Sequence, residues 1–280
     1  MPPEFLVIGG AVADKTSAGL RLGGGAVYGA LAAHRLGLNT ALVTIPHQRL
    51  DISAALPGIA VHLIDAPAST AVFENIETPS ERIQRWCGDA TRIRPDDIPV
   101  TWQDTPVVFL APTAQEVDVA LVSLFPNAVV GVSPQGWFRL RNQAGFVFSG
   151  PWRGAVSVLA RADVVVVSPQ DYGARRGVER LLARVPLLAI TEGQRGVRLR
   201  TQKKWQRVSA FSVNVVDTTG AGDVFAAALM VALREGMQPL DAARFASCAA
   251  SFVVEGEGFS ALPTRDQVEH RLAAGNNIRT

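Results

Sequence analysis

The sequence has little net charge and little charge of any kind. Charged residues make up 19% of the 280 residues, and 27 Lys and Arg against 25 Asp and Glu leave a net charge of +2. This balance excludes the extended basic surface with which proteins bind nucleic acids or acidic membranes. Hydrophobic residues reach 48%, which excludes a disordered chain and suffices for a sizeable core. We therefore expect a globular protein without a nucleic-acid partner.

Cysteine and long apolar segments are also scarce. Cys87 and Cys248 are the two cysteines and lie far apart, so neither a disulfide scaffold nor a CxxC zinc site is expected. The longest apolar run, Phe225–Leu233, is far shorter than the ~20 residues of a membrane-spanning helix. The N-terminal segment has no basic residue before its apolar stretch, unlike a signal peptide. These absences predict a cytoplasmic protein without a membrane partner.

Short apolar runs alternate with segments of helical length. Continuous apolar runs are typical of strands that are covered on both faces, as in a parallel sheet. Alternating strands and helices predict an α/β fold with a Rossmann-like, doubly wound and mostly parallel sheet. The predicted strands are Phe5–Ile8, Thr40–Ile45, Val107–Leu110, Ala128–Val132, Asp163–Val167 and Leu187–Thr191. The predicted helices are 26–36, 114–125, 152–160, 174–184, 221–235, 240–254 and 265–274.

Two regions depart from this alternation. Residues 59–86 contain the strand-like segments VHLID and TAVFENIE, with turn signals between and after them. We interpret 59–86, together with part of 12–24, as a small β-sheet within a single domain that comprises residues 1–280. A sheet inserted in this way commonly forms a lid over the open end of the core. Residues 196–199 and 205–208 predict a β-hairpin.

The most informative segment is Val215–Phe225, with the sequence VVDTTGAGDVF. A strand, a loop of small residues and an apolar helix in this order would direct the N–H groups of Gly220, Ala221 and Gly222 to one point. The positive end of the helix dipole lies behind that point, which would suit a phosphoryl group in transfer. Asp223, in the first helical turn, is placed to accept a proton from an attacking hydroxyl. The structural alternative is an ordinary helix start, with the Asp favourably placed against the dipole.

This segment resembles a known protein family. Asp217–Met230 resembles the C-terminal signature of the PfkB, or ribokinase-like, family of sugar and nucleoside kinases, and Gly23–Ala30 resembles its N-terminal glycine signature. Thr191–Gly196 resembles the T-x-G-x-x-G nucleotide element of the family. The resemblance implies a Rossmann-like core with a β-sheet lid. It also implies that Asp223 is the catalytic base and that residues 220–222 form the anion hole.

The resemblance further implies which residues bind each ligand. For the acceptor they are Asp14, Gly24, Gly25, Tyr28, Phe73, Asn75, Gln135 and Arg139. For ATP, the implied donor, they are Ser168, Thr191, Gly193, Gly196 and Ser247. Asp171 would hold Mg²⁺ through water, and Asp217 matches the family's potassium-site residue, which suggests K⁺ as a further cofactor. Lids in the family often pair, so a homodimer through the lid is expected; for Asp14, a solvated loop carboxylate is the alternative.

Some positions depart from the family pattern. Tyr28 replaces an Asn that touches the sugar in many members, and Ser247 replaces an Asn or His near the adenine. Ser168 and Asp171 replace the Asn and Glu of the N-x-x-E element, which orders Mg²⁺. Ser and Asp are shorter but still offer oxygen ligands to a hard cation. These changes therefore bear on the substrate and on the placement of the metal; ordinary strand-end and helix positions are the alternative for Ser168 and Ser247.

Two segments suggest the acceptor. Ser69–Asn75 resembles the S-T-x-F-E-N lid strand of sugar and polyol kinases, and Phe73 and Asn75, two residues apart, would share one face of that strand. Ser133–Arg139 resembles the Q-G-x-x-R element of inositol-type members, in which the Gln and Arg face the site. We expect an inositol-like polyol ahead of ribose-like sugars and nucleosides. The alternatives are a Phe73 that only packs in the lid and an Arg139 on the surface.

Other nucleotide-binding motifs are missing. No Gly-Lys dipeptide occurs, which excludes a Walker P-loop, and the cluster that begins at Gly23 has Tyr28 where a dinucleotide fingerprint needs its third glycine. The sequence therefore predicts an enzyme, an ATP-dependent phosphotransferase that phosphorylates a hydroxyl of a sugar or cyclic polyol. A nucleoside kinase of the same fold and a non-catalytic nucleotide- or sugar-binding module are the alternatives.

Overall fold

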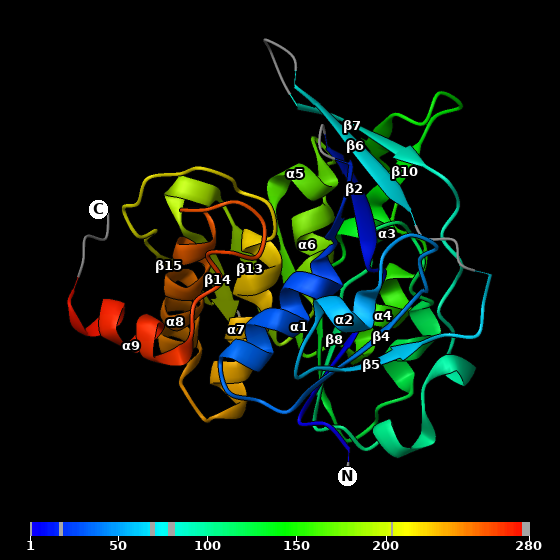
Figure 1. Ribbon diagram of the computed structural model, residues 1–280. Coiled ribbons are helices and arrows are strands. Elements are labelled where there is room, and N and C mark those ends of the chain that lie inside the picture. Colours follow the sequence, from blue (N-terminus) through cyan, green and yellow to red (C-terminus); the bar gives the residue numbers. More distant parts are fainter. Residues whose placement is uncertain (1, 17–18, 68–70, 78–81, 203, 276–280) are drawn as a thin grey trace.

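The computed structural model describes residues 2–16, 19–67, 71–77, 82–202 and 204–275. In this part of the chain a nine-stranded central sheet has the order β15-β14-β13-β12-β9-β8-β1-β4-β5 (Figure 1). The strands from β13 to β5 run parallel, whereas β14 and β15 extend the sheet as an antiparallel hairpin. The strands are β1 (Phe5–Ile8), β4 (Thr40–Thr44), β5 (Ala60–Leu63), β8 (Val107–Leu110), β9 (Val129–Val132), β12 (Val164–Val167), β13 (Leu187–Thr191), β14 (Val197–Thr201) and β15 (Lys204–Val208).

Helices cover both faces of the central sheet (Figure 1). One face packs against α1 (Gly25–Arg35), α2 (Ile52–Ala55), α7 (Ala221–Arg234) and α8 (Pro239–Val253), and α9 (Arg265–Ala273) packs outside α8. The other face packs against α3 (Gln135–Phe138), α4 (Ala155–Arg161), α5 (Pro169–Tyr172) and α6 (Val178–Leu182). Short 3-10 helices lie at Pro95–Asp97, Val100–Trp102, Val119–Ser123 and Gly193–Arg195. No helix in these described residues is long and apolar enough to cross a membrane.

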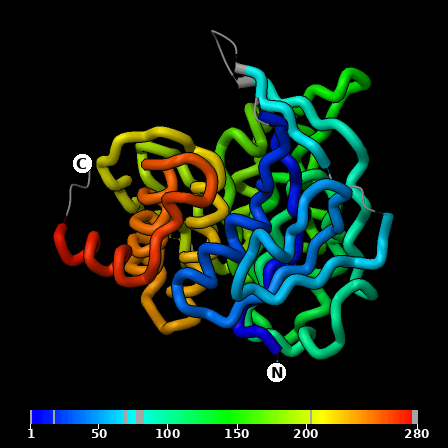
Figure 2. The backbone as a smooth tube through the Cα atoms, viewed as in Figure 1, coloured from blue at the N-terminus to red at the C-terminus, as the bar shows by residue number. Residues whose placement is uncertain are grey.

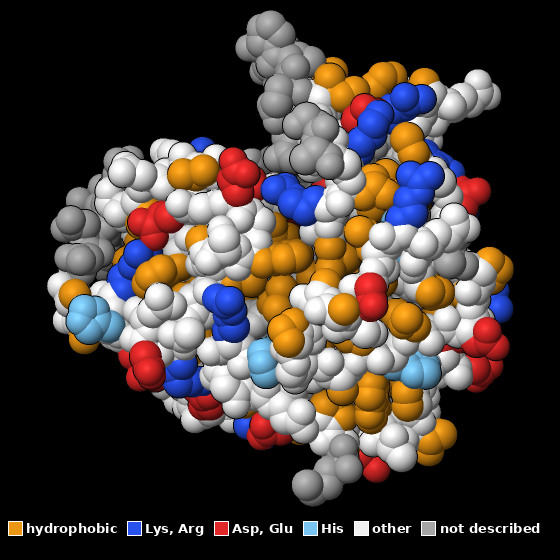
Figure 3. Space-filling view, in the orientation of Figure 1, with side chains coloured by type: hydrophobic (Ala, Val, Ile, Leu, Met, Phe, Trp, Pro, Cys, Tyr) orange, Lys and Arg blue, Asp and Glu red, His pale blue; other side chains and the backbone are white. Residues whose placement is uncertain are grey.

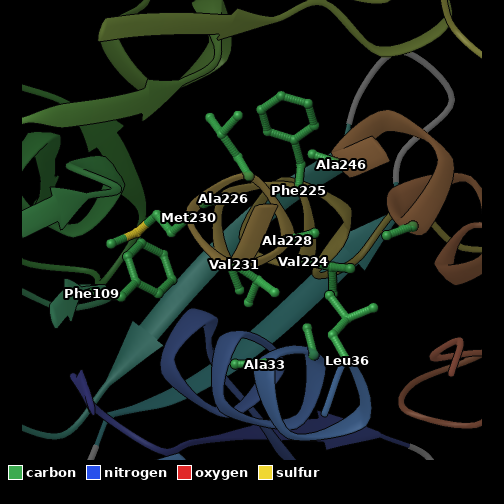
Figure 4. Close-up of a cluster of buried hydrophobic side chains, with 14 of the residues drawn as sticks. Ala33, Leu36, Phe109, Val224, Phe225, Ala226, Ala228, Met230, Val231 and Ala246 are labelled. Carbon is green, nitrogen blue, oxygen red and sulfur yellow. The ribbon is translucent and has the colours of Figure 1, made fainter. Parts of the chain in front are cut away.

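The two faces of the sheet are buried in separate hydrophobic clusters. Phe5 and Val7 of β1 belong to the cluster under α1, α7 and α8, whereas Leu6 and Ile8 belong to the cluster on the opposite face. Such alternation explains why the strand sequence is apolar at every position. Figure 4 shows the first cluster, in which Phe109 of β8 lies beside Met230 of α7.

A second, four-stranded sheet stands beside the carboxyl ends of the parallel strands. Its order is β3-β2-β6-β7, and its strands are β2 (Val12–Thr16), β3 (Gly19–Gly23), β6 (Val72–Glu77) and β7 (Arg82–Cys87). Figure 2 shows how the blue segment near the N-terminus and the cyan segment come together in this sheet, although about 50 residues separate them in sequence. We call this sheet the lid. The predicted α/β fold with a mostly parallel sheet and a small separate β-sheet is confirmed.

A hairpin extends the lid on its β7 side. It consists of β10 (Arg139–Arg141) and β11 (Val147–Ser149), and it joins β7 through a bridge between Arg85 and Phe146. The Trp86 N–H also donates to the Gly145 carbonyl oxygen at 2.8 Å. Lid and hairpin share a small cluster that includes Phe73, Trp86 and Val147. The hairpin therefore belongs to the lid in space, although it follows β9 in sequence.

The predicted extent of the lid was wrong at its start. Residues 60–63 form β5, which pairs in parallel with β4 and is the edge of the central sheet. Ala60–Leu63 are therefore no part of the lid, whose second half has its first strand, β6, from Val72 onward. Ser69 and Thr70, and the turn predicted at 78–80, lie outside the described residues. The assignment of 1–280 to one domain stays a prediction.

Three further predicted elements differ from the structure. The helix predicted at 114–125 is reduced to the 3-10 turn Val119–Ser123, because the Glu116 carboxylate accepts the N–H groups of Thr113 and Ala114 and holds them in a loop. The helix predicted at 174–184 is only α6, which begins after a left-handed Gly177. No strand precedes the α7 loop in the described residues; Val215 and Val216 are irregular and exposed.

We expect the lid to contribute less to global stability than the central sheet. Phe109→Ala should lower the free energy of unfolding by about 3 to 5 kcal/mol, because Phe109 is fully buried among large neighbours. Phe73→Ala should cost clearly less, because its cluster is small and the lid can open by itself. Urea denaturation of both variants measures this difference. Equal losses would show that lid and core unfold as one unit.

Candidate active site

A cavity of about 820 Å³ opens between the lid, the carboxyl ends of the parallel strands and the start of α7. This edge of the sheet is where open α/β sheets commonly bind ligands. The residues predicted for the acceptor, the anion hole, the base and the nucleotide all line it, as does Asp171, whereas Asp217 is not among its described lining residues. In Figure 3, hydrophobic side chains gather at the centre of the visible face, below the lid.

The first turn of α7 forms one wall of the cavity. Gly220 lies in the left-handed region (φ 78°), and a Cβ atom there would overlap the ring of Tyr28, so only glycine fits. Gly220, Ala221 and Gly222 all line the cavity. The Ala221 N–H has only a long bond of 3.3 Å, to the carbonyl oxygen of Thr218. The turn can therefore present backbone donors to an anion in front of the helix dipole.

Asp223 extends from this turn toward the start of α1. A Cβ atom on Gly25 would overlap the Asp223 carboxylate, so the two helix ends approach as closely as a glycine allows. Burial raises the pKa of Asp223 to about 7, and the negative charge of Asp171 adds to this effect while Arg139 opposes it. A carboxyl with a pKa near 7 is well matched to general-base work at neutral pH.

Asp14 of β2 lies on the lid side of the cavity. A Cβ atom on Gly23 would overlap its carboxylate, so β3 passes close to it. Asp14 takes part in a further interaction in the structure. The negative charge of Asp14 is felt by both Tyr28 and Arg139. Asp14 thus lies in a strand and not in a loop, and its role in binding an acceptor stays a prediction.

Tyr28 of α1 lines the cavity and lies against Gly220 at the start of α7. Its ring is 2% exposed and contacts the ring of Phe259 edge-on, with 4.7 Å between centroids. Burial, followed by the charge of Asp217, raises the pKa of the Tyr28 hydroxyl to about 12. The hydroxyl therefore stays neutral and can both donate and accept hydrogen bonds.

The inner face of the lid presents one aromatic ring and two amides. Phe73, Asn75 and Gln84 line the cavity, and Gln84 lies directly opposite Asn75 across the β6–β7 pair. The Gln84 side chain donates to the Asn75 side-chain oxygen at 3.0 Å. This bond fixes both amides, and each keeps hydrogen-bonding capacity for a polar ligand.

Arg139 and Asp171 lie close enough to Asp223 for their charges to act on it. The Arg139 guanidinium lies 5.3 Å from the centre of the Phe73 ring and donates to the Thr113 carbonyl oxygen at 3.1 Å. Burial lowers the pKa of Arg139, and the carboxylates around it, Asp171 first and Asp223 next, oppose this effect. The Arg139 side chain is thus a cavity cation and not the surface cation of the alternative interpretation.

Asp171 is held by two donors. The Gln135 amide donates to one carboxylate oxygen at 2.9 Å, and the Ser168 backbone N–H donates to the other at 2.7 Å. These bonds fix the start of α5 and aim the carboxylate into the cavity. Each oxygen retains a lone pair, so the carboxylate can still hold a hydrated cation.

The arm of the cavity beside α8 is mostly apolar. Thr191, Gly193 and Gly196 form its loop side. The Ser247 hydroxyl is buried and has no hydrogen-bond partner among the described residues. The arm is also lined by the polar Gln194 and Ser251 and by apolar residues: Val197, Ala210, Phe211, Val213, Val215, Ala250 and Val254. Such a slot, with one unpaired hydroxyl, is suited to a flat apolar group with a polar edge.

Residues 172–265 match the family model described as pfkB family carbohydrate kinase. The ribokinase of Bacillus subtilis is 48% identical over 87 residues, which are 31% of this chain and 30% of that enzyme. The nucleoside kinase of Methanocaldococcus jannaschii is 34% identical over 97 residues, 34% of this chain and 32% of that protein. The matched segments thus span about a third of these curated relatives. Over residues 172–265, about a third of the chain, the sequence is therefore similar to the pfkB family of carbohydrate kinases.

Solved structures show the same fold over nearly the whole chain. A pyrophosphate-dependent kinase of the ribokinase family, solved with a pyrophosphate analog and myo-inositol, has a TM-score of 0.78 at 20% identity and covers 95% of this chain and 99% of its own. Arabidopsis thaliana ribokinase, solved with ribose and ATP, has a TM-score of 0.73 at 20% identity, with 97% and 99% covered. The fold of this chain is therefore ribokinase-like.

The predicted cations, Mg²⁺ and K⁺, remain predictions. In the described residues, no three His, Cys, Asp or Glu side chains lie close enough together to hold a metal ion. Asp171 fits a role as a carboxylate that binds Mg²⁺ through water, since it lies near Asp223 and faces the cavity. One Asp217 oxygen accepts the N–H and the hydroxyl of Thr219, at 2.9 and 2.6 Å, and a role in binding K⁺ is untested.

The sequence interpretation missed two residues of this region. Gln84 lines the cavity, but only the pairing of β6 with β7 places it opposite Asn75. Glu116 is 1% exposed and lies behind Arg139, but its segment was predicted to be a helix. The sequence offered no distinct signal for Gln84, because its strand, RIQRWC, does not alternate regularly and Arg85 follows it directly. The sequence offered none for Glu116 either.

We predict that Asp223 titrates near pH 7 and that its two charged neighbours shift its pKa in opposite directions. Asp171→Asn should lower the pKa, because it removes a negative charge, and Arg139→Gln should raise it, because it removes a positive one. Carboxyl ¹³C NMR titration measures this, with Asp223→Asn to assign the signal. Asp163→Asn, at the amino end of β12, serves as the control. An Asp223 signal that titrates near pH 4 would contradict the prediction.

Proposed function

We propose that the protein is an ATP-dependent kinase that phosphorylates a hydroxyl of a sugar or cyclic polyol, with an inositol-like polyol as the first candidate. The main support is the meeting of three groups in one cavity. Asp223, with a pKa near 7, lies at the start of α7 beside backbone donors, and Asp14 and Arg139 face it from the lid side. These groups would supply a general base, an anion-binding site and side chains that bind hydroxyl groups, all within one cavity.

The transfer follows from these positions. The acceptor hydroxyl gives its proton to Asp223 while its oxygen attacks the terminal phosphorus, and the bond from that phosphorus to the ADP oxygen breaks. The N–H groups of residues 220–222 and the Arg139 guanidinium balance the charge on the transferring group. Mg²⁺, held through Asp171, would neutralise phosphate charge when bound. Positioning and electrostatics thus supply most of the rate in this class of reaction.

The acceptor end supports a polyol. Asp14 offers a carboxylate, Asn75 and Gln84 offer amides, and Tyr28 offers a neutral hydroxyl, so the walls can bind several hydroxyl groups at once. Phe73 supplies the apolar cover that a ring face needs. The structural neighbour bound to myo-inositol shows that this fold accepts such a ligand. Cytoplasmic location and a homodimer through the lid remain part of the proposal.

The donor end supports ATP over pyrophosphate. The described lining residues include one arginine, Arg139, and no lysine, whereas a donor made only of phosphates would need several cations. The arm beside α8 is apolar and offers the unpaired Ser247 hydroxyl. A purine base fills such a slot, and pyrophosphate would leave it empty. Neighbours of this fold are described with either donor.

A panel of cyclic polyols, sugars and nucleosides, assayed with ATP, tests the proposed function. Inositol-like polyols should have the highest kcat/KM, and Asp223→Asn should lower kcat by roughly 10² to 10⁴-fold while ATP still binds. A carboxyl pKa raised from its ordinary value to about 7 costs the folded state stability as pH rises through that window. The variant should therefore melt no lower than wild type at pH 8. A wild type that binds ATP but phosphorylates no acceptor would be a binding module.

A bulky residue in the α8 arm tests the donor. Ala250→Trp should raise the KM for ATP about fivefold or more, because overpacking of the slot costs about 1 to 3 kcal/mol. Any activity with pyrophosphate should stay unchanged in this variant. Ala273→Trp, on the exposed end of α9, is the matched control. If pyrophosphate proves the better donor of the wild type and Ala250→Trp leaves the rate unchanged, the assignment of ATP is wrong.

A further inference from the structure

Glu116 is a buried carboxylate that joins two loops at the carboxyl edge of the sheet. It is 1% exposed. One oxygen accepts the Gly10 N–H at 2.7 Å, from the loop after β1. The same carboxylate accepts the Thr113 N–H at 2.9 Å and the Ala114 N–H at 2.6 Å, from the loop after β8. Three charge-assisted bonds of this kind hold a loop firmly, because their loss would leave buried N–H groups unpaired.

The loop that Glu116 holds forms hydrogen bonds with both the guanidinium and the backbone of Arg139. The Thr113 carbonyl oxygen accepts from the Arg139 guanidinium at 3.1 Å, and the Gln115 side-chain amide donates to the Arg139 backbone carbonyl at 2.6 Å. The helix before Arg139 packs on the same loop, since a Cβ atom on Gly136 would overlap the backbone at Pro112 and Thr113. The main chain and the charged head of Arg139 are therefore both placed by residues 112–116.

The position of the Arg139 guanidinium depends on this loop, because its other surroundings do not fix it. Its guanidinium lies over the Phe73 ring, and it forms no ion pair with a carboxylate among the described residues. Four carboxylates act on it from farther away, those of Asp171, Asp223, Glu116 and Asp14. A long side chain with this freedom would otherwise swing toward one of them and leave the transfer position.

We propose that Glu116 is a positioning residue for phosphoryl transfer, which acts by fixing the loop 112–116 and through it the Arg139 guanidinium. The inference rests on the proposed function. Glu116 itself does not line the cavity, so it contributes through Arg139 and not by contact with a ligand. A purely structural role, in which the carboxylate only stabilises the fold, is the competing explanation.

A double-mutant cycle separates the two explanations. The variants are Glu116→Gln, Arg139→Met and the double variant, with kcat/KM for the best polyol and KM for ATP as readouts. Glu116→Gln should lower kcat/KM for the acceptor by up to about 100-fold, as misplacement of a reacting group by an ångström does. The KM for ATP should change less than about twofold. In the Arg139→Met background the same change should cost less than about threefold, because the group that it positions is already gone.

A structural role would give different results. It would lower the rate by the same factor in both backgrounds and would raise the KM for ATP together with that of the acceptor; either result overturns the proposal. Asp163→Asn is the matched control. The Asp163 carboxylate also accepts a backbone N–H, from Val130 at 2.8 Å, but it lies at the opposite, amino end of the parallel strands. The control variant should lower the melting temperature and leave the cycle's readouts unchanged.

Gln115→Ala covers the case in which Glu116→Gln does not fold. It breaks the bond to the Arg139 carbonyl without disturbing the buried carboxylate, and it should lower kcat/KM for the acceptor in the same direction by a smaller factor. A fully active Gln115→Ala together with an unfolded Glu116→Gln would overturn the proposal. A wild type without transfer activity would overturn the proposed function, whereas an active wild type with an additive cycle overturns only the role of Glu116.

Discussion

The close approach of two helix starts, those of α1 and α7, is the constraint on which the cavity depends. Gly25 meets the Asp223 carboxylate, and Gly220 meets the ring of Tyr28, with no room for a Cβ atom at either glycine. The approach is possible because α1 and α7 pack side by side over one face of the sheet, in the cluster that Figure 4 shows. It encloses the Asp223 carboxylate, and this enclosure raises its pKa to about 7. A side chain at either glycine would open the gap and return the carboxyl to water.

The cavity holds more negative than positive charge, and that imbalance has a function in the proposed reaction. Asp14, Asp171 and Asp223 line it together with one cation, Arg139. Mutual repulsion raises the pKa of Asp223, and the excess negative charge can be balanced by a hydrated divalent cation bound with its phosphates. An apoprotein built this way gives up stability at the site, a common feature of sites arranged for catalysis. Asp171 is kept in place by Gln135 and Ser168, so the repulsion cannot relax by moving it.

The β10–β11 hairpin connects the lid to this charged centre, and the same hairpin forms one edge of the lid. The β10–β11 hairpin begins at Arg139 and ends at Ser149, whose hydroxyl donates to the Asp171 carbonyl oxygen at 2.9 Å. The same hairpin pairs with β7 of the lid. A lid that closes on an acceptor therefore moves, or is held by, the segment that carries Arg139. Closure and charge placement are linked through one short hairpin, which would make water exclusion and phosphoryl positioning a joint event.

The sequence by itself determined the parallel strands, because continuous apolar runs such as Phe5–Ile8 are buried on both faces of a sheet. It also determined the loop and helix start at Gly220–Asp223, because small residues in this order have few other uses. Nearly every site residue that the resemblance to PfkB kinases implied lines the cavity. Tertiary structure alone decided the rest. Ala60–Leu63 belong to the central sheet and not to the lid, because the sequence of a strand does not determine which strand it pairs with. Glu116 became a loop anchor, and the pKa of Asp223 rose, because both depend on groups that folding brings together from distant parts of the chain.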